Sequence, residues 1–543
     1  MRLVPFVSIL AILTCPAVAQ DHDHGQAPVE KLGTVHFETS CSAAAQPLFD
    51  RAVALLHSFE FQRAIDGFTA VLKADPSCSM ANWGIALSRW GNPFAAGLRP
   101  PAQLQLGREA IERATSPLPP TERERKYIDA VGVLYGNFER VAQDARLRAY
   151  RDSMAALATV YSLDDEATIF FALSLAVAAD PADKTYASQL RAGALLEKLF
   201  AAHPDHPGLA HYIIHTYDVP PLADRALEAA RRYATIAPSA PHALHMPSHT
   251  FTRVGYWQES IDTNIASAAS AKREGATGEE LHATDYQMYA YLQTGQDRAA
   301  GKLIAALPEI ASRFNPTAGG GAAPPSAAYF ALAAIPARYA LERGAWADAV
   351  KLVPRTTPFP YTEAMTYFAR ALGAARLRQP ATMREAIDAL AQIHDRLAKS
   401  GETYWAEQVE IQRHAASAWL TLVEGRKDDA VAAMRAVALR EDATEKNAVT
   451  PGPLAPAREL LGEMLLEVTQ PAAAMTEFEA TLKKEPNRFR ALAGAAKAAT
   501  AIGDRTSARK YYDQLLKVCA RADTPGRPEL VDARKAVTPS GAR

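Results

Sequence analysis

The chain has 543 residues, which is long enough for about three or four domains or for one long array of repeats. Hydrophobic residues make up 48% of it and charged residues 22%, and the helix formers Ala, Leu, Arg and Glu dominate, so we expect an all-α fold with essentially no sheet. Because 59 Lys and Arg residues balance 60 Asp and Glu residues, the net charge of -1 gives no electrostatic reason to expect nucleic acid or an anionic membrane surface as a partner.

Residues 1–19 are predicted to be a signal peptide. Arg2 precedes a short apolar stretch, and Ala17 and Ala19 form a small-residue cleavage site before residue 20. The stretch is too short and too close to the terminus for a membrane span, and no later segment reaches ~18 uninterrupted apolar residues. We therefore expect a periplasmic or secreted protein without a transmembrane segment. A lipoprotein modified at Cys15 is the alternative.

Cleavage after Ala19 would leave a mature chain that begins with "QDHDHG", and residues 20–44 are expected to be a polar tail and lead-in. The amine of Gln20, two backbone amides and the imidazole of His22 make a square-planar nitrogen set, which Cu(II) and Ni(II) prefer. The alternatives are a disordered polar tail without metal, or a pyroglutamate that removes the amine. The sequence thus offers His22 as an N-terminal metal ligand.

A spacing of aromatic and small residues recurs along the chain. In "FQRAIDGFTAVLKADP" (61–76) an aromatic residue is followed by an Ala-Ile pair, further apolar residues and a closing proline, and "WQESIDTNIAS" (257–267) repeats this start. Near the C-terminus, Ala474 aligns with Ala508 and Phe478 with Tyr512, and the two pairs have the same separation. A fixed period of this length is typical of helical repeats.

This pattern resembles the tetratricopeptide repeat (TPR), a helix-turn-helix unit of about 34 residues. The opening repeat is also similar to that of a group of exported bacterial TPR proteins of poorly defined function. Since one hairpin cannot bury its apolar face alone, the resemblance implies a right-handed superhelical solenoid of about twelve TPR-like hairpins. We expect arrays over 45–313 and 327–520, a mobile Gly/Pro loop or lid at 314–326, and a disordered tail at 521–543.

The mature chain would keep three cysteines, Cys41, Cys78 and Cys519. An oxidising compartment permits one disulfide among them. Stacked repeats of the TPR type bring the lead-in of the first hairpin beside the start of the next repeat. We therefore predict a Cys41–Cys78 disulfide that leaves Cys519 free, with three reduced, buried thiols as the alternative.

Two histidine pairs repeat at the same period. His211 and His215 stand in "GLAHYIIHTY", and His245 and His249 stand one period later in "HALHMPSHTF". Duplication of one repeat would copy such pairs without any function, but the residues between them differ, so duplication alone does not explain them. Pro247 removes one backbone hydrogen bond inside the second pair and is expected to kink its helix.

The TPR register implies that these histidines lie on the first helices of their repeats and face the concave groove. It sends three sets of side chains into the groove: His211, His215 and Asp218; His242, His245 and His249; and His282 and Asp285. Residues four apart on a helix lie about 6 Å apart and stacked helices pack at about 8–10 Å, so the two repeated pairs are expected to reach a common point.

Neutral imidazole is a preferred ligand of Zn, Cu, Fe and Ni, so the sequence predicts a transition-metal site. Its candidate ligands are His211, His215, His245, His249, and further His242, Asp218, His282 and Asp285, with Glu166 nearby. Histidines that contact a peptide or a small ligand, or that only pack, are the alternatives. Because groove positions would face solvent, we expect their replacement to leave the helices intact.

Two classes of function therefore stay open. The first is an exported TPR scaffold that binds a protein, a peptide or a small ligand in its concave groove and carries the histidine patch. The second is a metal-dependent enzyme, a hydrolase or an oxidase, on the same solenoid. No HExxH, P-loop, CxxC or CxxCH motif is present, so catalysis would depend on the metal.

Overall fold

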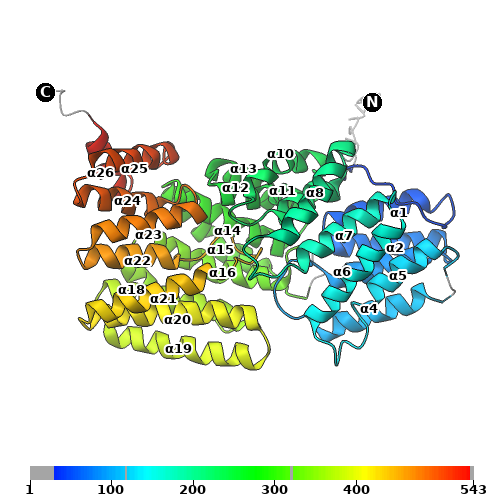
Figure 1. The fold of residues 1–543 in the computed structure, drawn as a ribbon, viewed down its shortest axis with the longest axis horizontal. Helices are drawn as coiled ribbons and strands as arrows, with labels where there is room; N and C mark the ends of the chain where they lie inside the picture. The colour runs from blue at the N-terminus through cyan, green and yellow to red at the C-terminus, as the bar shows by residue number, and fades with distance from the viewer. Residues whose placement is uncertain (1–29, 117–118, 318–321, 539–543) are drawn as a thin grey trace, which may run out of the picture.

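The computed structural model describes residues 30–116, 119–317 and 322–538, and these contain helices but no strands. Figure 1 shows stacked helix pairs from one end of the molecule to the other. Twelve antiparallel hairpins follow one another within the described residues, from α1 with α2 to α24 with α25, and α26 closes the stack. The expected all-α superhelical solenoid is confirmed. No described helix is both long and apolar enough to cross a bilayer.

The first seven hairpins contain α1 (Gln46–His57), α2 (Phe61–Ala74), α3 (Ser79–Trp90), α4 (Pro101–Ala114), α5 (Glu122–Gly132), α6 (Gln143–Val160), α7 (Asp165–Val177), α8 (Ala187–Ala202), α9 (Pro207–Thr216), the 3-10 turn η1 (Ala223–Ala226), α10 (Leu227–Ile236), α11 (Pro241–His245), α12 (Pro247–Val254), α13 (Trp257–Arg273), α14 (Thr277–Gln293) and α15 (Asp297–Arg313).

The remaining hairpins contain α16 (Pro325–Glu342), α17 (Trp346–Val350), α18 (Pro360–Arg376), α19 (Pro380–Lys399), α20 (Thr403–Val423), α21 (Lys427–Asp442), α22 (Ala457–Glu467), α23 (Pro471–Lys484), α24 (Phe489–Ala501), α25 (Arg505–Val518) and α26 (Pro528–Val537).

Small residues let the helices approach closely where they cross. A Cβ atom on Gly84 of α3 would stand 2.3 Å from the ring of Phe68 of α2, and one on Gly193 of α8 would stand 2.0 Å from the hydroxyl of Tyr217. Larger side chains at these glycines would push the hairpins apart. The repeat signal of small residues opposite aromatic ones therefore reflects packing between helices.

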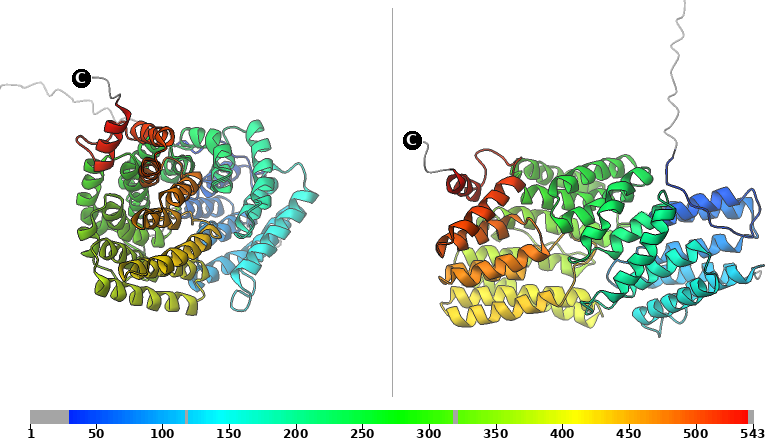
Figure 2. Two further views of the ribbon diagram at one scale, coloured as in Figure 1. Left: turned by 60° about the vertical axis from the view of Figure 1, so that its left-hand side comes forward. Right: turned by 45° about the horizontal axis from the view of Figure 1, so that its top comes forward.

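The superhelix also closes on itself, because the C-terminal hairpins pack back on the middle of the chain (Figure 2). The indole Nε1 of Trp257 donates to the carbonyl oxygen of Asn487 at 2.9 Å. Arg488, at the start of α24, is fully buried and binds Glu342 at 2.6 Å and Glu459 at 2.7 Å. These contacts cover part of the face that an open solenoid would leave free.

Both ends of the array are more ordered than the sequence indicated. Residues 521–538 were expected to be disordered, but they form a turn and α26, whose Leu530 and Ala533 are fully buried. In the lead-in, Phe37 packs between the rings of Phe49 and Trp83. Apolar residues spaced to cover the exposed ends of the array explain the difference. The signal peptide and His22 lie outside the described residues.

Two connections enter the interior of the superhelix. The first is the Gly/Pro loop, of which residues 318–321 lie outside the described part; its Ala322 and Ala323 are buried, and α16 begins at Pro325. The second is the segment 443–456 between α21 and α22, which we name the strap. Both connections line a cavity together with the histidines described below.

A disulfide joins Cys41 to Cys78 across the first two hairpins, with an S–S distance of 2.02 Å. This is the pair expected from the sequence. Cys519 is buried and makes no disulfide.

Candidate metal centre

Three neighbouring hairpins bring six histidines together, and all six lie on first helices. His211 and His215 belong to α9, His242 and His245 to α11, His249 to α12 and His282 to α14. Proline opens α9, α11 and α12, where its missing N–H costs nothing. In the second of these hairpins the first helix is interrupted at Met246, between α11 and α12, so the kink expected at Pro247 appears as a one-residue interruption of the helix.

The six side chains form two triads rather than the single four-histidine point expected from the sequence. His211, His215 and His242 make the first triad, and His245, His249 and His282 make the second; within each triad, one ligand nitrogen per residue lies within 4.8 Å of the others. The repeat period had paired His211 with His245. Instead His242 groups with the two histidines of α9, while α14 supplies His282 to the second triad.

In the first triad, a backbone carbonyl outside the triad fixes the tautomer of one histidine, His211. His211 Nδ1 lies 2.6 Å from the backbone carbonyl oxygen of His57, and since a carbonyl only accepts, this nitrogen carries the proton. His211 Nε2 therefore presents a lone pair to His242 Nε2 at 3.2 Å. His215 Nε2 and His242 Nδ1 are buried without a hydrogen-bond partner among the described residues.

In the second triad, both tautomers follow from the hydrogen bonds. Asn264 donates its side-chain nitrogen to the carbonyl oxygen of Ser260 at 2.6 Å, so its Oδ1 accepts from His245 Nδ1 at 2.7 Å. His249 Nδ1 donates to Asp218 Oδ2 at 3.1 Å. With both protons on Nδ1, the two Nε2 lone pairs of His245 and His249 face each other at 3.1 Å.

This spacing fits a shared cation. Two ligand nitrogens at about 2.0–2.1 Å from one ion, at a tetrahedral angle, lie roughly 3.3 Å apart. The contacts of 3.1 Å in the second triad and 3.2 Å in the first are close to this value. The carbonyl, amide and carboxylate partners behind the rings also match the outer shell that usually orients metal-bound histidines.

The two aspartates expected as ligands are engaged elsewhere. Asp218 binds Arg253 at 2.7 Å and Lys446 of the strap at 3.0 Å, besides holding His249. Asp285 pairs with the buried Arg338 at 3.0 Å. Ion pairing makes both carboxylates parts of the support rather than of the candidate ligand set.

The imidazoles are held in the neutral form that metals require. Burial lowers the pKa of His211 and of His282 to about 3, and it lowers the pKa of His215, His242, His245 and His249 as well. Burial alone would raise the pKa of the Asp218 carboxyl. The cations of Lys446 and Arg253 outweigh this effect and hold its pKa well below its usual range.

None of the six histidines is more than 7% exposed, which corrects the expectation that they face solvent. The ring of Phe59, in the turn between α1 and α2, lies 4.3 Å from that of His211, and Phe94 stacks on His215 at the same distance. The Gly/Pro loop and the strap complete the cover. The single hydroxyl of Tyr286 lies 3.2 Å from the strap carbonyl oxygens of Ala448 and Thr450 and 3.3 Å from His249 Nε2. The repeat register of the sequence did not predict that these segments cover the histidines.

A small cavity of about 30 Å³ remains beside the triads. His215 and His242 of the first triad and His249 and His282 of the second line it. Such a volume exceeds the roughly 10–15 Å³ that one water molecule requires. An ion in either triad therefore has room for one additional small ligand.

A third group of potential ligands consists of Glu166, which the sequence placed near the candidate ligands, and of His57 and His206, which it did not indicate. Glu166 accepts from His57 Nε2 at 2.9 Å and from His206 Nε2 at 3.0 Å. The other ring nitrogens bond to the Tyr212 hydroxyl at 2.9 Å and the Leu209 amide at 3.3 Å. Since every nitrogen is paired, this group is a structural network. Neither histidine has a counterpart one repeat period away, so register gave no signal.

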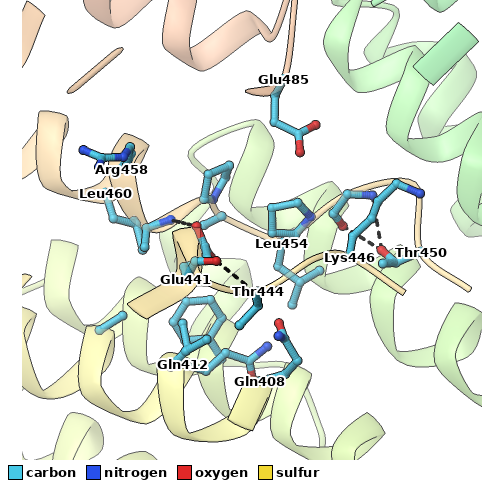
Figure 3. A pocket seen from close by; sticks show the side chains of 18 of the residues that line it. Gln408, Gln412, Glu441, Thr444, Lys446, Thr450, Leu454, Arg458, Leu460 and Glu485 are labelled. Atoms are coloured by element: carbon cyan, nitrogen blue, oxygen red, sulfur yellow. Dashed lines mark hydrogen bonds between the residues drawn. The ribbon is translucent and has the colours of Figure 1, made fainter. Parts of the chain in front are cut away.

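A larger cavity of about 100 Å³ lies across the strap from the histidines (Figure 3). Gln408 and Gln412 of α20 point into it, opposite Leu454 of the strap, and Lys446 and Thr450 also line it. Gln408 Nε2 and Gln412 Oε1 are buried and have no partner among the described residues. This part of the concave face offers a donor, an acceptor and an apolar wall.

Comparisons with known proteins address the fold. No family model matches the chain, and no curated protein matches it. A solved structure of a human IFIT1 dimer with m7Gppp-AAAA aligns over 89% of this chain and 96% of its own at 8% identity, with a TM-score of 0.38. The Cut9–Hcn1 hetero-tetramer of the APC/C aligns over 91% of this chain and 90% of its own at 13% identity, with a TM-score of 0.36. A tetratricopeptide repeat protein from Parabacteroides merdae aligns over 55% of this chain and 98% of its own at 13% identity, with a TM-score of 0.27.

The fold is that of a TPR-like solenoid. The stacked helical hairpins of the chain itself confirm, at the level of the fold, the resemblance drawn from the repeat spacing. At these identities and TM-scores, nothing about ligands or partners carries over to this chain.

Proposed function

We propose that this protein binds two copper ions, one in each histidine triad. The observation that carries the proposal is the pair of Nε2 atoms of His245 and His249, 3.1 Å apart, whose protons are both committed to Nδ1. Two lone pairs in a dry interior repel each other, and a cation between them turns the repulsion into coordination. In the first triad, His211 Nε2 likewise presents a lone pair towards a second imidazole, His242 Nε2 at 3.2 Å.

The donor set and the charge around it favour copper. Neutral imidazole suits Zn, Cu, Fe and Ni alike. Asp218, the carboxylate hydrogen-bonded to His249, is already neutralised by Arg253 and Lys446, so little negative charge is left to compensate an ion. Because the cost of burying an ion rises with its charge, monovalent Cu(I) is favoured over divalent Zn, Fe or Ni.

The remaining parts of the proposal concern partner and location. A TPR-like fold suggests a protein partner, and the cavity of Figure 3 is the place where a protein side chain or a small ligand would bind. Export to the periplasm or beyond is supported by the Cys41–Cys78 disulfide, which persists in oxidising compartments. A metal-dependent oxidase or hydrolase is the second candidate, favoured by the cavity beside the triads.

Metal analysis tests the proposal. Apo-protein loaded anaerobically with Cu(I) in the presence of equimolar Zn(II), Fe(II) and Ni(II), and then desalted, should carry two copper ions per chain by mass spectrometry. Replacement of His245 and His249 by Asn should leave one, because the first triad keeps its ligands. The matched control is His203→Asn, whose half-exposed ring pairs with Asp165 away from the triads.

Wild-type protein without stoichiometric metal, or a double variant that keeps two ions, would refute the metal site. Selective uptake of zinc, iron or nickel would keep the site but reject copper. Screening apo-protein and copper-loaded protein for oxidase and hydrolase activity then separates a binding protein from an enzyme.

A further inference from the structure

The two triads are close enough to share one ligand. The rings of His215 and His249, which belong to different triads, have centroids 5.7 Å apart, and those of His242 and His245 have centroids 6.1 Å apart. Two histidines of each triad line the same cavity. Ions held by the triads would therefore be neighbours with one small space between them.

We propose that a single uncharged diatomic molecule, of the size of carbon monoxide or dioxygen, binds in this cavity and contacts both copper ions. This inference rests on the proposed function, because it requires an ion in each triad. It adds to that function the class of molecule that the centre accepts.

The walls of the cavity determine its size limit. Its volume of about 30 Å³ leaves room for little more than a diatomic molecule. Ala95, Ala96, Ala323 and Val449 form much of the wall away from the histidines, and Trp405 adds an aromatic surface. Three separate connections supply the small residues and α20 supplies Trp405, so the cavity cannot widen without moving several packed segments.

The polarity of the walls favours an uncharged ligand. Asn92 donates its side-chain nitrogen to the carbonyl oxygen of Ala322 at 3.3 Å, and its side-chain oxygen accepts from the Phe94 amide at 3.0 Å. The side-chain oxygen of Asn447 accepts from the Val449 amide at 3.0 Å. With these groups paired, the wall offers few hydrogen bonds to a polar molecule, and the metal ions would supply the attraction.

A neighbouring cleft offers a small molecule a route towards the histidine cavity. A cleft of about 460 Å³ lies on the other side of Asn92, Ala96, Ala323 and Trp405, all of which also line the histidine cavity. A small molecule in this cleft is separated from the histidines by one layer of mostly small side chains.

Carbon monoxide is the probe, because it binds Cu(I) without electron transfer. Full-length protein loaded with two Cu(I) ions should take up one carbon monoxide per chain, with one C–O stretching band in the infrared spectrum. The bulkier tert-butyl isocyanide, which also binds Cu(I) through carbon, should bind at least 100-fold more weakly. Replacement of Ala323 by Leu should keep two copper ions and reduce carbon monoxide binding at least tenfold, whereas the exposed control Leu163→Ala should not.

The copper content is measured on each sample first, so the proposals fail separately. Fewer than two copper ions in wild-type protein would overturn the proposed function and this inference together. Two copper ions with two carbon monoxide molecules or none, or with equal binding of tert-butyl isocyanide, would overturn the shared-ligand inference alone. If the Ala323→Leu variant loses copper, the Ala95→Leu variant is used in its place. Carbon monoxide binding that is unchanged in either copper-loaded variant contradicts the inference.

Discussion

At the scale of single residues, the orientation of the triad histidines depends on side chains outside the triads. Asn264 of α13 fixes the His245 tautomer, and its own orientation is fixed by the Ser260 carbonyl. Asp218 does the same for His249. The sequence indicated the ligand type because histidines in register stand out. It did not indicate Asn264, because a buried amide on a second helix has no distinctive spacing.

Replacement of Asn264 by Ala should weaken copper binding in the second triad by roughly 10–100-fold, because His245 loses the acceptor that holds its proton on Nδ1. The first triad should keep its affinity. Titration against a Cu(I) chelator measures both. Ser267→Ala is the matched control, since Ser267 is buried on the same helix and donates to the carbonyl oxygen of Pro241 at 3.0 Å and not to a histidine ring. Two unchanged affinities in Asn264→Ala would show that this amide does not position the ligand.

At the scale of elements, the repeat register correctly predicted that the histidines lie on neighbouring first helices. It did not predict how they group into two triads. The covers from the α1–α2 turn, the Gly/Pro loop and the strap bury the rings. These features arise from long-range contacts between segments that carry no repeat. For that reason register predicted an open groove, whereas the structure buries the six imidazoles.

Burial of the imidazoles should make the apo-protein sensitive to acid. Histidines of the unfolded chain bind protons near pH 6.5, but burial lowers the pKa of His211 and His282 to about 3 in the folded protein. Between these values the unfolded state binds more protons, so the free energy of unfolding is largest above about pH 6.5 and falls towards pH 3. Each such histidine contributes at most about 1.4 kcal/mol per pH unit.

Urea unfolding of apo-protein at pH 7 and pH 5 measures this effect. The wild type should lose stability at pH 5, and His282→Phe should lose less, because an apolar ring of similar size has no proton to bind. The exposed His203→Phe should retain the wild-type pH dependence. Equal stability of wild-type apo-protein at the two pH values would contradict the burial of neutral imidazoles.

At the scale of the whole molecule, a helical-repeat chain has been turned into a closed body. Composition and the repeat period were sufficient to predict the solenoid, because each hairpin must bury its apolar face on the next. They did not show that the start of α24 returns to α13 and α14, where Asn487 accepts from Trp257 and Arg488 donates to Tyr289, 230 and 199 residues away in the sequence. This closure leaves a central space in which connections, rather than a partner, surround the histidines.

The most direct test of this account is anomalous diffraction at the copper absorption edge from crystals of copper-loaded protein. Two peaks per chain are expected, one in each triad, at about 2.0–2.1 Å from the coordinating imidazole nitrogens. Absence of density in the triads, or copper bound only at other residues, would contradict the central claim that the six buried histidines form a pair of metal sites.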